Sequence, residues 1–150
     1  MNILSVRNQQ RVHRIASREF KKAATIALEQ LFQTPSYHLS VAFVTAKRMT
    51  EVNESHLQHE GPTDIITFDY SEADVLDGEL LICPAVAAEY SQRYNVSLGR
   101  ELARYFIHGV LHLHGHDDHA PDDRRRMKRE ENRLLAQLSK RFPVDTLAHG

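Results

Sequence analysis

The stretch HGVLHLHGHDDH, residues 108–119, carries five of the chain's ten histidines. Two of them, His108 and His112, are four residues apart. In a helix this spacing places side chains one turn apart and about 40° around the axis, so both imidazoles point to the same side. Imidazole nitrogens are common ligands of zinc and similar divalent ions. The pair therefore predicts a site for one metal ion, with His108 and His112 as ligands and as catalytic residues.

A third ligand is expected from the chain just after this helix. Gly115 is the residue type that ends a helix in a left-handed conformation and lets the chain turn back. A donor brought back by this reversal completes a three-residue site and leaves an open position, as catalytic metal sites do. His114 lies about 200° around the helix from His112 and is expected to point away. His116 is expected to be a solvated loop side chain.

Isolated helix histidines are more often plain surface or core residues than ligands. The i, i+4 pair followed by a glycine and a further donor makes the metal site the better interpretation. Position 109 is glycine, whereas zinc proteases with the HExxH motif carry a glutamate there as general base. Peptide hydrolysis by that mechanism is therefore disfavoured.

Strands early in the chain and helices late in the chain must position this site. Runs rich in β-branched and aromatic residues predict strands at 3–6, 38–45, 65–68 and 79–84. The turn signal Asp77-Gly78 suggests that the last two form an antiparallel hairpin. Helices are predicted where apolar residues recur at helical spacing or where a polar stretch lies between helix-breaking residues. These ranges are 14–32, 46–57, 84–94, 97–114 (with Ser97 as N-cap) and 121–140. We expect one α+β domain, residues 1–150, with one small mixed β-sheet and helices packed mainly on one face.

Several ordered motifs resemble the bacterial YbeY family of metal-binding rRNA maturation factors. They are PTDIITF (62–68), DGELLICP (77–84), RELARYFIHG (100–109) and the histidine-rich stretch 108–119. The match covers most of the chain from Asn53 to about Leu135. The resemblance implies an α+β fold with a zincin-like metal helix beneath the sheet and one divalent ion per chain, of the Zn²⁺ kind. It also implies endoribonuclease activity in 16S rRNA 3′ end maturation and in late ribosome quality control.

Two positions depart from the family pattern. The family's third histidine follows the second by six residues; this place is Asp118 here, and His119 comes one residue later. A gapless reading keeps Met127 in register with a family methionine and favours Asp118 as the third ligand. His119 is the alternative ligand if the loop bulges by one residue. Leu57 occupies the place of a family arginine thought to act on RNA, so that role is not carried over.

The composition is that of an ordinary globular protein, with 41% hydrophobic and 26% charged residues. No stretch is long and apolar enough to span a membrane. Cys83, the single cysteine, lies in an apolar run, so we expect a buried thiol and a cytoplasmic location. The formal net charge of −1 gives no overall attraction to polyanions. The basic run 124–129 is flanked by acidic residues and is interpreted first as a solvated helix face, with an RNA contact as the alternative.

We therefore expect a single-strand-specific, metal-dependent endoribonuclease. Its expected partners are rRNA and the ribosomal small subunit or its proteins, with no membrane and no small-molecule cofactor. RNA supplies its own nucleophile, the 2′-OH, so the missing glutamate at position 109 does not exclude cleavage. Two alternatives stay open: a non-catalytic, metal-stabilised ribosome assembly factor, and a metallohydrolase of another substrate such as peptide.

Overall fold

The computed structural model describes residues 2–56 and 63–149. A four-stranded sheet has the strand order β1-β3-β5-β4. Its strands are β1 (Ile3–Asn8), β3 (Tyr37–Phe43), β5 (Leu76–Ile82) and β4 (Ile65–Asp69). β3 runs parallel to both β1 and β5, whereas β4 pairs antiparallel with β5. The predicted mixed sheet and the predicted antiparallel hairpin are therefore confirmed.

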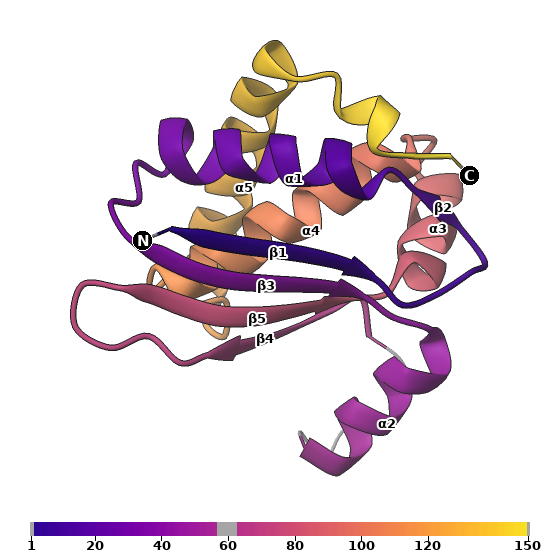
Figure 1. Cartoon of the computed structure of the whole chain (residues 1–150), viewed down its shortest axis with the longest axis horizontal. Coiled ribbons are helices and arrows are strands. Elements are labelled where there is room, and N and C mark those ends of the chain that lie inside the picture. The colour runs from indigo at the N-terminus through magenta and orange to yellow at the C-terminus, as the bar shows by residue number, and fades with distance from the viewer. Residues whose placement is uncertain (1, 57–62, 150) are drawn as a thin grey trace.

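The helices cover the two faces of this sheet unequally. They are α1 (Ser17–Ile26), continued by the π-helical turn η1 (Ala27–Leu31), α2 (Ala46–His56), α3 (Pro84–Arg93), α4 (Leu98–Leu113) and α5 (Pro121–Arg141). Figure 1 shows α1, α4 and α5 on one side of the sheet and α2 on the other. The fold is α+β with helices mainly on one face, as predicted.

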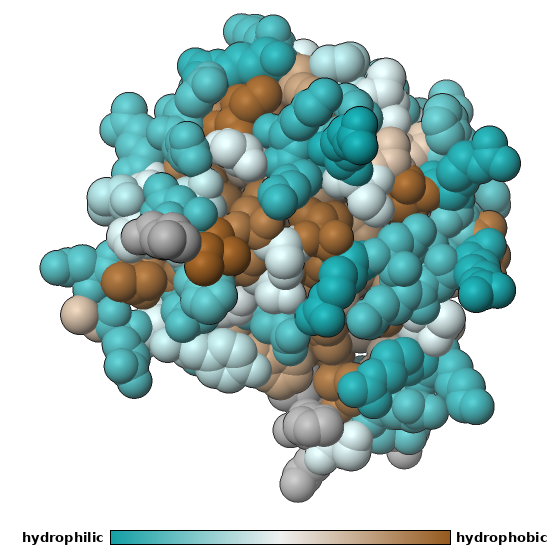
Figure 2. All heavy atoms as spheres, viewed as in Figure 1, coloured by the Kyte–Doolittle hydropathy of each residue, from teal (hydrophilic) through white to brown (hydrophobic). Residues whose placement is uncertain are grey.

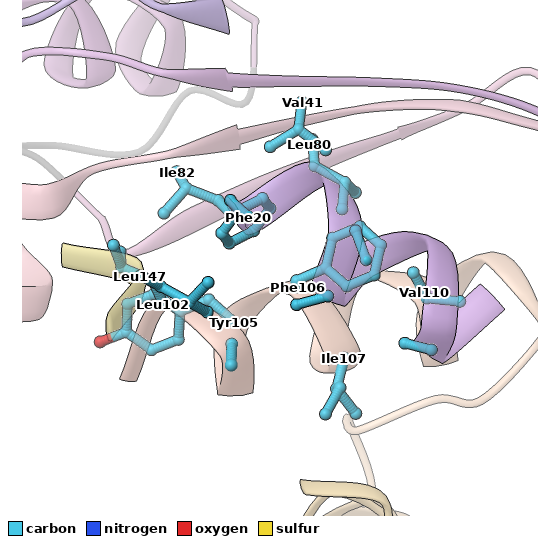
Figure 3. Close-up of a cluster of buried hydrophobic side chains, with 14 of the residues drawn as sticks. Phe20, Val41, Leu80, Ile82, Leu102, Tyr105, Phe106, Ile107, Val110 and Leu147 are labelled. Carbon is cyan, nitrogen blue, oxygen red and sulfur yellow. The ribbon is translucent and has the colours of Figure 1, made fainter. Parts of the chain in front are cut away.

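The main core lies between the sheet and helices α1 and α4. Figure 3 shows Phe20 of α1 between the sheet residues Leu80 and Ile82 and the α4 residue Phe106. The ring of Phe20 meets that of Phe106 edge-on, with centroids 5.7 Å apart. Full burial of such a side chain contributes about 1.5–3 kcal/mol, so this packing fixes α4 against the sheet.

A smaller hydrophobic cluster fills the space between α2 and the opposite face of the sheet. Met49 and Val52 of α2 pack there with Ala42 and Leu81. Cys83 belongs to this cluster and is fully buried, and burial raises the pKa of its thiol. The expectation of a buried thiol is confirmed.

The turn expected at Asp77-Gly78 is wrong. Both residues lie inside β5, and the chain turns between Tyr70 and Val75 instead. A Cβ at position 78 would lie 2.8 Å from Cδ2 of Leu113 on α4. The glycine therefore marks the close approach of a helix to a strand, which a sequence pattern does not separate from a turn.

A segment near the start of the chain pairs with one near its end, which the sequence did not predict. Arg14–Ile15 form the short strand β2 rather than the start of a helix. They pair antiparallel with β6 (Ala148–His149), which follows the 3₁₀ turn η2 (Val144–Leu147). Two-residue strands are too short to show any periodicity, so only the folded chain reveals them.

Polar side chains cover most of the face seen in Figure 2, and hydrophobic ones show only in the gaps between them. Among the described residues, no helix is both long enough and apolar enough to cross a membrane.

Candidate metal centre

Helix α4 carries both predicted histidine ligands and begins at a side-chain cap. The hydroxyl oxygen of Ser97 accepts a hydrogen bond from the backbone N–H of Arg100 at 3.0 Å, which confirms the predicted N-cap. The apolar side of α4 packs on the sheet, so His108 and His112 emerge at its edge. Their side chains are about a quarter exposed, at 22% and 28%. Both imidazoles are held by a packed helix and are still open to solvent.

Gly109 lets α4 approach the sheet beside this pair. A Cβ at position 109 would lie 2.8 Å from Cδ2 of Leu80 and 3.1 Å from Cδ1 of Ile65. A glutamate at this position would bury its carboxylate against two aliphatic side chains, without a partner. The packing thus accounts for the absence of the protease general base at this position.

A reversal after α4 brings Asp118 back toward the helix. Gly115 has φ +96°, the left-handed conformation expected from the sequence. The N–H of Gly115 donates to the carbonyl of His112, and the N–H of His116 donates to that of Leu111, each at 3.0 Å. These bonds satisfy the last carbonyls of the helix and set the direction of the following loop.

The three donor atoms lie close enough together to share one metal ion. Nε2 of His108 and Nε2 of His112 are 3.1 Å apart. Oδ2 of Asp118 lies 3.7 Å from the first nitrogen and 3.5 Å from the second. Ligands 2.0–2.2 Å from a tetrahedral zinc ion are about 3.3–3.6 Å from one another. Among the described residues, His108, His112 and Asp118 thus form a group that could hold one ion.

His119, the alternative third ligand, points elsewhere in the structure. Its side chain is 90% exposed, and its Nε2 lies 3.6 Å from Oδ1 of Asp117. Asp117, Asp118 and His119 have donor atoms close enough to form a second group, but two of the three are exposed. The geometry favours Asp118 over His119.

The other two histidines of the stretch lie outside this centre, as expected. Nε2 of His114 is 3.2 Å from the hydroxyl oxygen of Thr34, and its ring stacks on Phe32 at a centroid distance of 5.3 Å. Partial burial, together with the charge of His116, lowers the pKa of His114. His116 is exposed in the loop.

A network of charged side chains contacts His108 on the Nδ1 side of its ring, away from the proposed metal ion. Nδ1–H of His108 donates to Oε2 of Glu131 on α5 at 2.7 Å. The other carboxylate oxygen of Glu131 lies 3.6 Å from the guanidinium of Arg104, which also lies 3.6 Å from Glu101. The carboxylate fixes the tautomer of His108 that leaves Nε2 free to face an ion.

These carboxylates also set the protonation of the site. Burial lowers the pKa of His108, but the hydrogen bond to Glu131 and the negative charges of Glu131, Asp118 and Asp64 outweigh it, so the pKa is raised. Burial raises the pKa of Glu101, with Arg104 opposing the rise. Protons therefore compete with a metal for His108 at a higher pH than for an ordinary histidine.

Replacing Glu131 with glutamine is expected to weaken metal binding about tenfold. This is the lower end of the range of about 10- to 100-fold for partners of metal-ligating histidines, because the amide keeps an acceptor but loses the charge. Competition with a chromophoric chelator measures the change. The matched control is Glu130→Gln, since Glu130 lies next in sequence but pairs with Arg133 away from the site. Equal affinities of the two variants would contradict a supporting role for Glu131.

The three donor atoms border an open hollow of ≈ 610 Å³. Strand β4 and the turn before it form one wall, and the α4 histidines and the loop after α4 form the other. At the start of β4, Oδ1 of Asp64 accepts a hydrogen bond from the N–H of Ile65 at 2.7 Å and one from the hydroxyl of Thr63 at 3.3 Å. Thr63 and Asp64 thus shape the entry into β4 at the edge of the hollow.

Residues 5–139 match the family model described as endoribonuclease YbeY. The chain belongs to the YbeY family. Relatives named endoribonuclease YbeY include those of Chlorobium luteolum, 37% identical over 134 residues, and Bacteroides fragilis, 41% identical over 98 residues. The first alignment covers 87% of this chain and 98% of the relative, and the second covers 65% and 70%.

The fold also agrees with that of a solved structure. The solution structure of TM1509 from Thermotoga maritima matches with a TM-score of 0.67 and covers 91% of this chain and 89% of that one. The sequences are 23% identical, so this likeness concerns the fold alone.

The support from Glu131 and Arg104 was missed in the sequence. A signal was present: Glu131 interrupts the apolar face of α5, between the buried residues Met127 and Leu134. A carboxylate in such a stripe needs a buried partner. Leu57, the position that departs from the arginine of other YbeY proteins, lies outside the described residues.

Proposed function

We propose that this chain is a metal-dependent endoribonuclease that cuts single-stranded RNA. The observation that carries the proposal is the set of three donor atoms, from helix α4 and the loop after it, spaced for one ion beside an open hollow. Membership of a family described as endoribonuclease YbeY supplies the reaction class. The substrate we propose is the 3′ end of 16S rRNA, in maturation and late ribosome quality control.

We propose Zn²⁺ as the ion, held by His108, His112 and Asp118. Two imidazoles and one carboxylate are a ligand set that zinc accepts, with one position left open. Such an ion would supply Lewis acidity toward a phosphate oxygen and would make a water molecule more acidic.

Contacts within the chain orient this site. Glu131 holds His108 in the tautomer that presents Nε2, and the bonds that cap α4 hold the Asp118 loop. Residues of β4 line the hollow, and in this proposal an extended RNA strand lies along them. A rigid duplex keeps its bases stacked and presents a wide surface, so single strands are the fitting substrate.

The proposed setting is the cytoplasm, with the ribosomal small subunit or its proteins as partner. The lone buried thiol of Cys83 needs no oxidising compartment. The formal net charge of −1 gives the isolated protein little general attraction for RNA, so a ribosomal partner would raise the local concentration of substrate.

Cleavage of an rRNA fragment before and after metal removal tests the proposal. We expect the zinc-loaded protein to cut a single-stranded 16S 3′ fragment, to lose activity on chelation and to regain it when zinc returns. The same fragment annealed to its complement should resist. A preparation that holds one zinc per chain and leaves the single strand intact would refute the proposal. So would cleavage that is unchanged after the metal has been removed.

A further inference from the structure

The first three turns of α5 carry exposed cations beside the candidate metal centre. Arg124 and Lys128, one helical turn apart, line a hollow of ≈ 280 Å³ that also borders His108 and Asp118. The same two cations line a second hollow, of ≈ 490 Å³, together with Arg125 and Arg129. The two hollows are thus joined through a row of positive side chains that begins beside the proposed metal ligands.

Most other cations of α5 are neutralised by neighbouring carboxylates. Arg125 pairs with Asp122, and Arg126 pairs with Asp123. In the part of the chain that the structure describes, no carboxylate lies within 4.0 Å of the ammonium of Lys128 or the guanidinium of Arg129. Both side chains are exposed.

Arg124 is held in place without losing its charge. One of its guanidinium nitrogens donates to the backbone carbonyl of His119 at 2.7 Å. The guanidinium has five N–H donors in all, so others remain available. This bond joins the cationic face of α5 to the loop that carries Asp118.

Acidic side chains surround the candidate metal centre and repel a polyanion such as RNA. Cations nearby are therefore needed for RNA to bind there. The hollow beside His108 is also lined by the carboxylates of Asp64, Glu101 and Glu131, and its remaining cation, Arg104, lies between two of these. Carboxylates repel phosphate, and the net charge of the whole protein offers no attraction. Binding of several phosphates therefore depends on a local row of unpaired cations.

We propose that Arg124, Lys128 and Arg129, the cationic rim, bind backbone phosphates of the RNA strand next to the one that is cut. The inference rests on the proposed function. The basic run 124–129 was interpreted first as a solvated helix face, with an RNA contact as the alternative. The inference favours that alternative for three of its residues. The rim contacts phosphates, which every nucleotide carries, so it contributes affinity and position without reading the base sequence.

Two double variants test the rim with equal loss of charge. Lys128→Gln/Arg129→Gln removes two rim cations. Arg126→Gln/Arg133→Gln removes two other cations of the same helix, each already paired with a carboxylate. Glutamine keeps good helix propensity, so both should fold like the wild type.

Fluorescence anisotropy with a labelled twelve-nucleotide oligouridine, on zinc-loaded protein over a range of salt, gives the first readout. The rim variant should bind about tenfold or more weakly at low salt, and its log-log salt slope should be about 1.4 smaller, from about 0.7 for each lost contact. The control variant should bind within about twofold of the wild type, since its two cations are already paired with Asp123 and Glu130. For cleavage of a long RNA, the rim variant should show a raised KM with kcat nearly unchanged.

The outcomes separate this inference from the proposed function. If the wild type cuts RNA but the rim and control variants bind and cut alike, the rim is a solvated face or meets an acidic protein instead, and the inference is wrong. If the wild type binds RNA through the rim but never cuts it, the proposed function fails and the rim stands. If the wild type binds no RNA even at low salt, the inference is overturned whatever the cleavage assay gives.

Discussion

Replacing His112 with alanine is expected to remove the metal ion and to reduce RNA cleavage at least about 100-fold, with the fold intact. Losing a direct ligand should exceed the loss of about 10- to 100-fold that follows removal of a residue behind a ligand. His112 is a cleaner choice than His108, because replacing His108 would also leave the carboxylate of Glu131 without its hydrogen-bonded partner. Alanine is the best helix former, so α4 should persist.

Metal analysis, thermal melting and cleavage are measured together on His112→Ala. Zinc should raise the melting temperature of the wild type, because a ligand that binds only the folded state stabilises it, and should leave that of the variant unchanged. His116→Ala is the matched control, since His116 is an exposed histidine in the next turn of chain. A His112→Ala protein that still holds one zinc per chain would show that His112 is not a ligand. If it loses zinc but cuts RNA at the wild-type rate, cleavage does not depend on the ion.

The helix that presents the candidate site could be predicted because its signals are local. The cap at Ser97, the i, i+4 histidines and the positive φ of Gly115 each depend on a few neighbouring residues. Such local signals remain valid in the folded protein, because the backbone hydrogen bonds that they specify form within the same segment. The antiparallel pairing of β4 with β5 followed from the hydrophobic pattern, whereas the place of β3 between β1 and β5 was not predicted.

What was missed depends on contacts between distant segments. Glu131 is 23 residues from His108 along the chain, and the pattern of α5 shows which face is buried but not which side chain it meets. The pairing of β2 with β6 joins a segment near the start of the chain to one near its end. Gly78 was misread for the same reason, since the side chain that requires a glycine there comes from α4.

The choice between Asp118 and His119 as third ligand could be made only in part from local sequence signals. A shift of one residue in the loop exchanges Asp118 for His119, and sequence spacing has no means of locating one extra residue in a loop. In the structure, the N–H groups of Gly115 and His116 bind carbonyls of α4 and fix the loop. This leaves Asp118 facing the two imidazoles and His119 facing solvent.

Asp118→Ala is therefore expected to lose the metal ion, whereas His119→Ala should keep it. In Asp118→Ala only two of the three donor atoms that the described residues bring together remain. In His119→Ala all three donor atoms stay in place. Zinc content after dialysis against a weak chelator, measured for both variants beside the wild type, gives the comparison directly.

Asp118→His adds a test in the other direction, because it restores the three-histidine ligand set that the family pattern carries at this spacing. A histidine at position 118 should retain zinc, since imidazole and carboxylate bind it at similar distances, about 2.0–2.2 Å. Restoring metal in this variant after its loss in Asp118→Ala would show that position 118 itself supplies the third ligand. Loss of zinc from His119→Ala alone would instead mean that the loop rearranges by one residue when metal binds, so that His119 replaces Asp118 as the third ligand.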